Sequence, residues 1–164
     1  MHEPVGPALL VWLETTAVAA AMRQWLWLYP TVEVVHILGL AALVGGAVLF
    51  DLRLLGVARA LPVTRLARLL LGAARWSLVL IVPSGLLMFA AHATEMWDNP
   101  AFRAKLVLIA AAGANAWAFH RFTMPGAAAW DAGAPTPPAA RAAGLASLVL
   151  WIGVVTCGRL LAYL

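Results

Sequence analysis

Four long apolar stretches dominate the pattern of hydrophobic and polar positions along the chain. They run from about 29 to 50, 74 to 97, 102 to 120 and 142 to 164. A helix needs roughly 20 predominantly apolar residues to cross the hydrocarbon core of a bilayer. The 164 residues therefore predict one membrane domain with an all-α fold, a four-transmembrane-helix bundle.

A shorter apolar segment, about 8–22, precedes the first span. Glu14 interrupts it, and the start of the chain carries His2 and Glu3 where a signal peptide carries Lys or Arg. A segment of this length with a charge inside it is a poor span, and amphipathic helices of this kind lie in the membrane interface. We therefore expect an N-terminal interfacial helix.

Breaker residues refine the second span and the last connection. Thr64 begins a basic helical extension that we expect to lead into the second span. Pro83-Ser84-Gly85 falls inside that span and predicts a kink. The segment from Pro125 to Pro138 is rich in Ala, Gly and Pro, which is typical of an irregular loop.

The composition agrees with a membrane protein and excludes several other classes. The chain is 64% hydrophobic and 11% charged, with a mean hydropathy of +0.91. Its arginines are too scattered for a nucleic-acid surface, and it has no P-loop, Rossmann or nucleophile-elbow motif. A single cysteine, Cys157, excludes an internal disulfide. The lipid bilayer is thus the expected partner, and no nucleic acid is expected.

The arginines predict the orientation. The connection between the first two spans holds five arginines against Asp51 alone: Arg53, Arg59, Arg65, Arg68 and Arg75. The next connection is balanced in charge. Because loops rich in Lys and Arg stay in the cytoplasm, we expect the first connection inside and both termini outside. The predicted location is the bacterial inner membrane.

Two Glu/His pairs, Glu33 with His36 and His92 with Glu95, lie in or near the spans. Ionisable residues at membrane depth are costly and often mark function. At a rise of about 1.5 Å per residue, His36 lies about 9 Å inside Pro30 and His92 about 7–8 Å before the end of its span. We therefore expect both imidazoles at similar depth in the outer leaflet.

Two cations join this polar layer, so that every span contributes to it. Lys105 lies near the start of the third span and Arg159 near the end of the fourth. We take His36, His92, Arg159 and Lys105 as candidate cofactor-binding residues, and Glu33, His36, His92 and Glu95 as candidate metal ligands. His120 falls at the inner end and cannot share a haem iron with His36. A structural alternative is that each Glu/His pair only hydrogen-bonds within itself.

Five different motifs are distributed along nearly the whole chain: Leu28-Tyr29-Pro30 with Glu33 and His36, Asp51-Leu52-Arg53-Leu54-Leu55-Gly56, Ser84-Gly85-Leu86-Leu87-Met88-Phe89, Asn99-Pro100-Ala101-Phe102-Arg103-Ala104-Lys105 and Gly158-Arg159-Leu160-Leu161-Ala162-Tyr163. With them the chain resembles an uncharacterised bacterial family of small four-helix membrane proteins, a domain of unknown function. It resembles b-type cytochromes and copper-resistance membrane proteins more distantly. The resemblance implies that Glu33, His36, Lys105 and Arg159 belong to the family pattern, and it assigns no reaction.

Three functions stay open at this point, and whether the protein is an enzyme is open as well. The first is redox: His36 and His92 bind haem b, and Arg159 or Lys105 meets a propionate. The second is a divalent metal such as zinc or copper held by the two Glu/His pairs. The third is a structural or accessory membrane subunit, or a proton-coupled transporter that uses Glu33 and His36. A homo-oligomer or a larger membrane complex is compatible with each.

Overall fold

The computed structural model describes residues 6–161 and 163, and in that part of the chain every regular element is a helix. The all-α prediction is therefore confirmed. The elements are α1 (Ala8–Thr15), α2 (Ala17–Gln24), α3 (Leu28–Leu54), α4 (Val63–Leu66), η1 (Ala67–Leu71), α5 (Gly72–Ala91), α6 (Ala93–Asp98), α7 (Pro100–Ala118), η2 (Phe119–Thr123), η3 (Met124–Trp130) and α8 (Pro138–Leu160).

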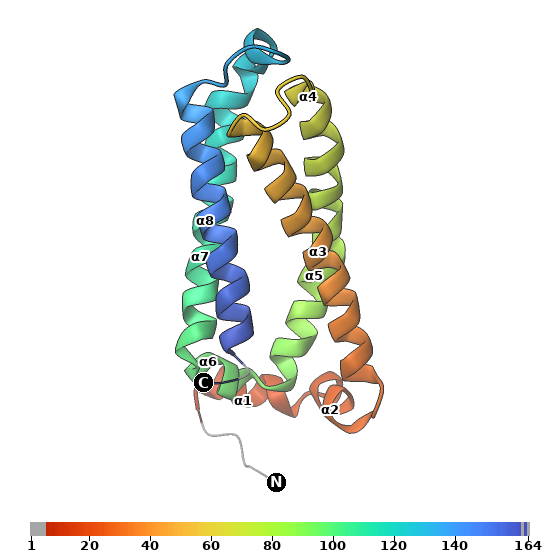
Figure 1. Cartoon of the computed structure of the whole chain (residues 1–164). Coiled ribbons are helices and arrows are strands. Elements are labelled where there is room, and N and C mark those ends of the chain that lie inside the picture. Colours follow the sequence, from red (N-terminus) through yellow and green to blue (C-terminus); the bar gives the residue numbers. More distant parts are fainter. Residues whose placement is uncertain (1–5, 162, 164) are drawn as a thin grey trace.

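The long helices form an elongated bundle of two antiparallel pairs (Figure 1). α3 packs along α5, α7 packs along α8, and α3 also contacts α8. The short helices α1, α2 and α6 lie together at one end, which we call the α1 end. The opposite end, called the α4 end, holds α4 and the segment between α7 and α8 (Figure 1).

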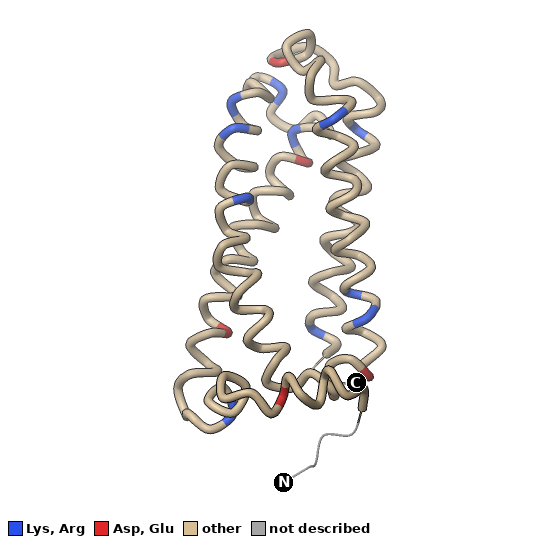
Figure 2. Tube along the Cα trace, turned by 180° about the vertical axis from the view of Figure 1, so that it is seen from behind, with Lys and Arg blue, Asp and Glu red and all other residues tan. Residues whose placement is uncertain are grey.

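Among the described residues, three helical segments are long and apolar enough to cross a membrane: Leu28–Leu54, Val63–Ala91 and Pro138–Leu160. The second includes the basic extension expected from Thr64, because α4, η1 and α5 follow one another without a break. α7 is a fourth long helix, but Arg103 and Lys105 in its first turns lower its hydropathy. Most Lys and Arg lie toward the α4 end (Figure 2).

Two predicted boundaries are wrong. The second span does not reach residue 97, because α5 ends at Ala91 and His92 leaves the helical conformation at φ −143° and ψ 47°. The N-terminal segment is not one helix over 8–22 but two. Thr16 separates them, and its hydroxyl accepts a hydrogen bond from the Ala19 amide at 3.3 Å, capping α2.

Arg53 holds the α4 end together. Its side chain is 2% exposed and donates hydrogen bonds to the backbone carbonyls of Leu61, Arg59 and Asp131 at 2.8, 3.2 and 3.0 Å. These bonds tie the α3–α4 loop to the segment before α8. Within residues 125–138, which we expected to be irregular throughout, η3 forms a 3-10 helix and its Trp130 packs into the core of this end.

Candidate functional site

His36 is held against α5 by Ser84. The His36 Nδ1 lies 3.0 Å from the Ser84 Oγ, and that hydroxyl also contacts the carbonyl of Leu80 at hydrogen-bond distance. A hydroxyl has one proton, and the short contact to Leu80 requires it. Ser84 therefore accepts a hydrogen bond from the Nδ1–H of His36. This assignment leaves Nε2 of the neutral ring unprotonated, able to bind a metal or accept a proton.

Glycines let the two helices approach at this point. A Cβ on Gly85 would lie 3.2 Å from the Cε1 of His36, and one on Gly39 would lie 2.7 Å from the Cγ1 of Ile81. Small residues at such contacts allow helices to pack closely in lipid. Ser84 and Gly85, expected only to kink the span, also form the surface on which the His36 ring rests.

Lys105 reaches the same region from α7. Its side chain is half-buried, and its Nζ lies 3.9 Å from the position that a Cβ on Gly158 of α8 would take. The charged groups close enough to act on His36 are Lys105 and Glu33. Glu33 is exposed on the surface of the bundle, whereas His36 is half-buried. His36 and Lys105 are thus the half-buried ionisable residues of this polar region.

His92 lies elsewhere in the α1 end. Its ring packs edge-on against Tyr29, with 5.8 Å between the ring centroids and 81° between the planes. Tyr29 precedes His36 by seven residues, about 10 Å along the axis of α3. The similar depth expected for the two imidazoles therefore does not hold. The expected depth of His92 assumed that its span continues to Trp97. In the structure α5 ends at Ala91, one residue before His92.

The end of α5 is stabilised by two residues that sequence reasoning left without a role. Arg23 of α2 donates hydrogen bonds to the carbonyls of Ala91 and Glu14, both at 2.8 Å. The Glu14 Oε1 accepts hydrogen bonds from the amide and the hydroxyl of Thr94, at 2.7 and 2.8 Å. The C-terminus of α5 and the N-terminus of α6 are thereby satisfied. The sequence offered one signal of this role, because Glu14 is a carboxylate inside an apolar segment.

The remaining predicted site residues do not join His36. Arg159 is exposed; its guanidinium bonds to the Tyr163 hydroxyl, with its Cζ 4.9 Å from the Tyr163 ring centroid. Glu95 is exposed on α6. Over residues 6–161 and 163, no three His, Cys, Asp or Glu side chains lie close enough to hold a metal ion. The predicted four-ligand set therefore gains no geometric support.

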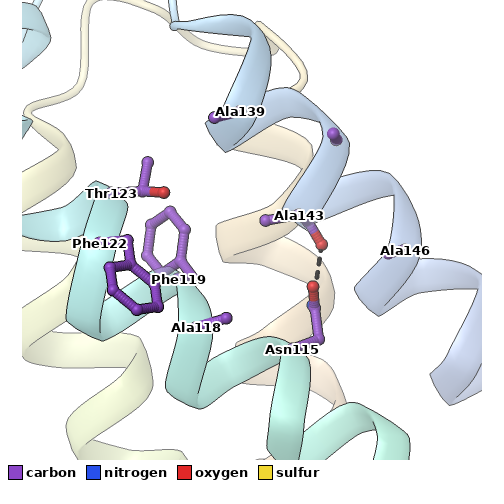
Figure 3. A pocket seen from close by; sticks show the side chains of 9 residues that line it. Asn115, Ala118, Phe119, Phe122, Thr123, Ala139, Ala143 and Ala146 are labelled. Atoms are coloured by element: carbon purple, nitrogen blue, oxygen red, sulfur yellow. Dashed lines mark hydrogen bonds between the residues drawn. The ribbon is translucent and has the colours of Figure 1, made fainter.

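A groove at the α4 end lies apart from His36. It runs between the end of α7 and the start of α8 and is lined mainly by alanines together with Phe119 and Phe122 (Figure 3). Asn115 donates a hydrogen bond across it to the carbonyl of Ala143 at 3.0 Å (Figure 3). This interaction fastens α7 to α8 near the α4 end.

Residues 9–164 match the model of a family of unknown function, DUF6644. The chain belongs to this family. A search of curated proteins and a search of solved structures each gave no match. The expected membership of an uncharacterised family is confirmed, while the resemblance to b-type cytochromes and copper-resistance proteins stays a prediction. Because DUF6644 has no assigned activity, function has to be argued from the site.

Proposed function

We propose that this DUF6644 protein spans the bacterial inner membrane four times and binds a haem b through His36 for electron transfer. α7 serves as the fourth span because it runs antiparallel beside α8 (Figure 1). Its Arg103 and Lys105 lie at the α1 end, where long side chains can reach the interface. The arginine-rich α4 end faces the cytoplasm by the positive-inside rule, so the α1 end and both termini face outside.

The contact between the His36 Nδ1 and the Ser84 Oγ is the observation that carries the haem proposal, because it leaves Nε2 free to bind iron. Histidines that bind a metal commonly donate their other ring N–H to a second protein group, which fixes the tautomer. Ser84 accepts that bond here. No three His, Cys, Asp or Glu side chains cluster in the described chain, which disfavours a site for a divalent metal. This finding does not bear on haem, because a haem needs only one or two protein ligands.

The other polar residues fit a haem with one histidine ligand. Lys105 lies close enough to act on His36 and can pair with a propionate, and Arg159 offers a second cation at the same end. His92 is about two helical turns farther out, against Tyr29. His36 would hold the iron, and the bound group would supply one-electron redox chemistry.

Absorption spectroscopy of the protein purified from haem-replete cells tests the proposal. We expect a Soret band in the wild type, its loss in His36→Ala, and its retention in His92→Ala. His120→Ala, at the opposite end of the bundle, serves as a matched control and should keep the band. A wild-type protein that folds without any Soret band would overturn the haem proposal.

The same geometry favours one alternative. An unprotonated Nε2 with Glu33 and Lys105 nearby can also accept a proton. The protein would then be an accessory subunit of a larger membrane complex, or a proton-coupled transporter. Proton flux into liposomes distinguishes proton transport from haem binding. The transport alternative expects a flux that falls in Glu33→Gln and His36→Gln, in a protein without bound haem.

A further inference from the structure

A second ionisable group lies on α3, far from His36. Asp51 follows it by fifteen residues, about 22 Å along the helix, and belongs to the α4 end. Its side chain is 5% exposed, and its Oδ2 has no hydrogen-bond partner among the described residues 6–161 and 163. The proposed function makes no use of it. A buried polar atom without a partner requires a physical explanation.

Close packing of α8 seals this position. A Cβ on Gly144 would lie 3.3 Å from the Asp51 carbonyl oxygen and 3.1 Å from the Cβ of Leu54. Ser147, one turn further along α8, presents the polar side chain that faces the Asp51 carboxyl. Phe50 precedes Asp51 on α3, and its ring packs against the Phe119 ring with 5.7 Å between the centroids. The carboxyl is therefore buried beside one hydroxyl, with its Oδ2 unpartnered among the described residues.

No cation of the described chain balances this carboxyl. Arg53, two residues further along α3, is bound to loop carbonyls instead. The charged or titratable groups on the other elements at this end include Arg68 on η1, Arg75 on α5 and His120 on η2, and none of them hydrogen-bonds to Asp51 Oδ2. Arg68 and Arg75 are exposed.

We propose that Asp51 is a proton-binding site. An ionised carboxylate between α3 and α8 would be a buried charge with one oxygen unpaired, which is far more costly than a neutral carboxyl group. The proton comes from water at the α4 end and binds to one carboxylate oxygen, giving a carboxylic acid. Proton release would place a negative charge in the α3–α8 contact and weaken it.

Infrared spectroscopy in liposomes tests this directly. We expect a carboxylic-acid C=O band in the wild type at neutral pH that is missing in Asp51→Asn. Asp131→Asn is the matched control, because both oxygens of the Asp131 carboxyl have partners: they accept hydrogen bonds from the amide and hydroxyl of Thr64 at 2.8 and 3.1 Å. Identical C=O regions in the wild type and Asp51→Asn would overturn the proposal.

Thermal unfolding gives a second, independent readout. A folded state that keeps a proton which the unfolded chain has released loses stability as the pH rises. We therefore expect the stabilisation that the Asp51 proton gives the wild type to be lost as the pH rises from about 4, where an aspartate in an unfolded chain releases its proton, to neutral, and Asp51→Asn to lack this loss. Asparagine keeps the size of the side chain, so this variant should fold. An equal pH dependence in both proteins would contradict a proton on Asp51.

Discussion

Ser84 accepts a hydrogen bond from the Nδ1–H of His36, and this bond crosses the contact between α3 and α5. The Ser84 proton is committed to the carbonyls of its own helix, at Leu80 and Ile81. The hydroxyl therefore has one role toward His36, that of acceptor. It fixes both the position of the ring and the nitrogen that is left available for chemistry.

Removal of this acceptor should cost stability and change the site. In Ser84→Ala, the Nδ1–H of a half-buried ring loses its partner, which we expect to destabilise the protein by about 1 kcal/mol. Thermal unfolding in detergent measures the loss. Ser77→Ala is a matched control on α5, because the Ser77 hydroxyl donates only within its own helix, to Ala74. An equal effect of both substitutions would show that the bond to His36 contributes nothing.

Gly85 should be more sensitive to a methyl group than a glycine with open surroundings. In Gly85→Ala the new Cβ would lie 3.2 Å from the His36 Cε1, so the ring must shift away from Ser84. We expect a loss of about 1–3 kcal/mol, the range of overpacking effects. Gly113→Ala on α7 meets no heavy atom within 4 Å and should be neutral or slightly stabilising. Thermal unfolding of the two variants side by side provides the comparison.

Glu14 should stabilise the junction between α5 and α6. Glu14→Ala removes the acceptor for the amide and hydroxyl of Thr94, and loss of a helix cap typically costs about 1 kcal/mol. Because the bonds are local, the clearest result is faster hydrogen exchange in α6 with little change in α3. Glu95→Ala, an exposed carboxylate on α6, is the control. Unchanged exchange at Thr94 would refute a capping role for Glu14.

The fold could be predicted from the sequence better than the site. The four long helices follow from apolar length alone, and the extension from Thr64 follows from continuous helical pattern. The break at His92 does not follow from the apolar pattern, because the residues that flank it have distant partners. Arg23 bonds to Ala91 across 68 residues, and Glu14 bonds to Thr94 across 80 residues. The helix ends six residues before the predicted boundary at 97, which at a rise of about 1.5 Å per residue is about 9 Å of depth.

Among the site residues, the pairing of His36 with Ser84 was hidden for a similar reason. Ser84 follows Pro83 inside an apolar span, so its first interpretation was local, as part of a kink. Its tertiary role depends on the register of α3 against α5, which is set by close contacts such as that of Gly39 with Ile81. A pattern within one helix contains no information on that register.

Arg53 provides the last prediction, because a buried guanidinium bound to three carbonyls cannot be replaced by another cation. Arg53→Lys keeps the charge but offers one ammonium to acceptors that lie in different directions at Leu61, Arg59 and Asp131. We expect a loss of about 3 kcal/mol, because a hydrogen bond that involves a charged group contributes about 1.5–3 kcal/mol and more than one would be lost. Arg65→Lys, at an exposed position of α4, should change the unfolding temperature little. If Arg53→Lys unfolded at the wild-type temperature, the loops of the α4 end would have to be held by apolar contacts such as those of Trp130 instead.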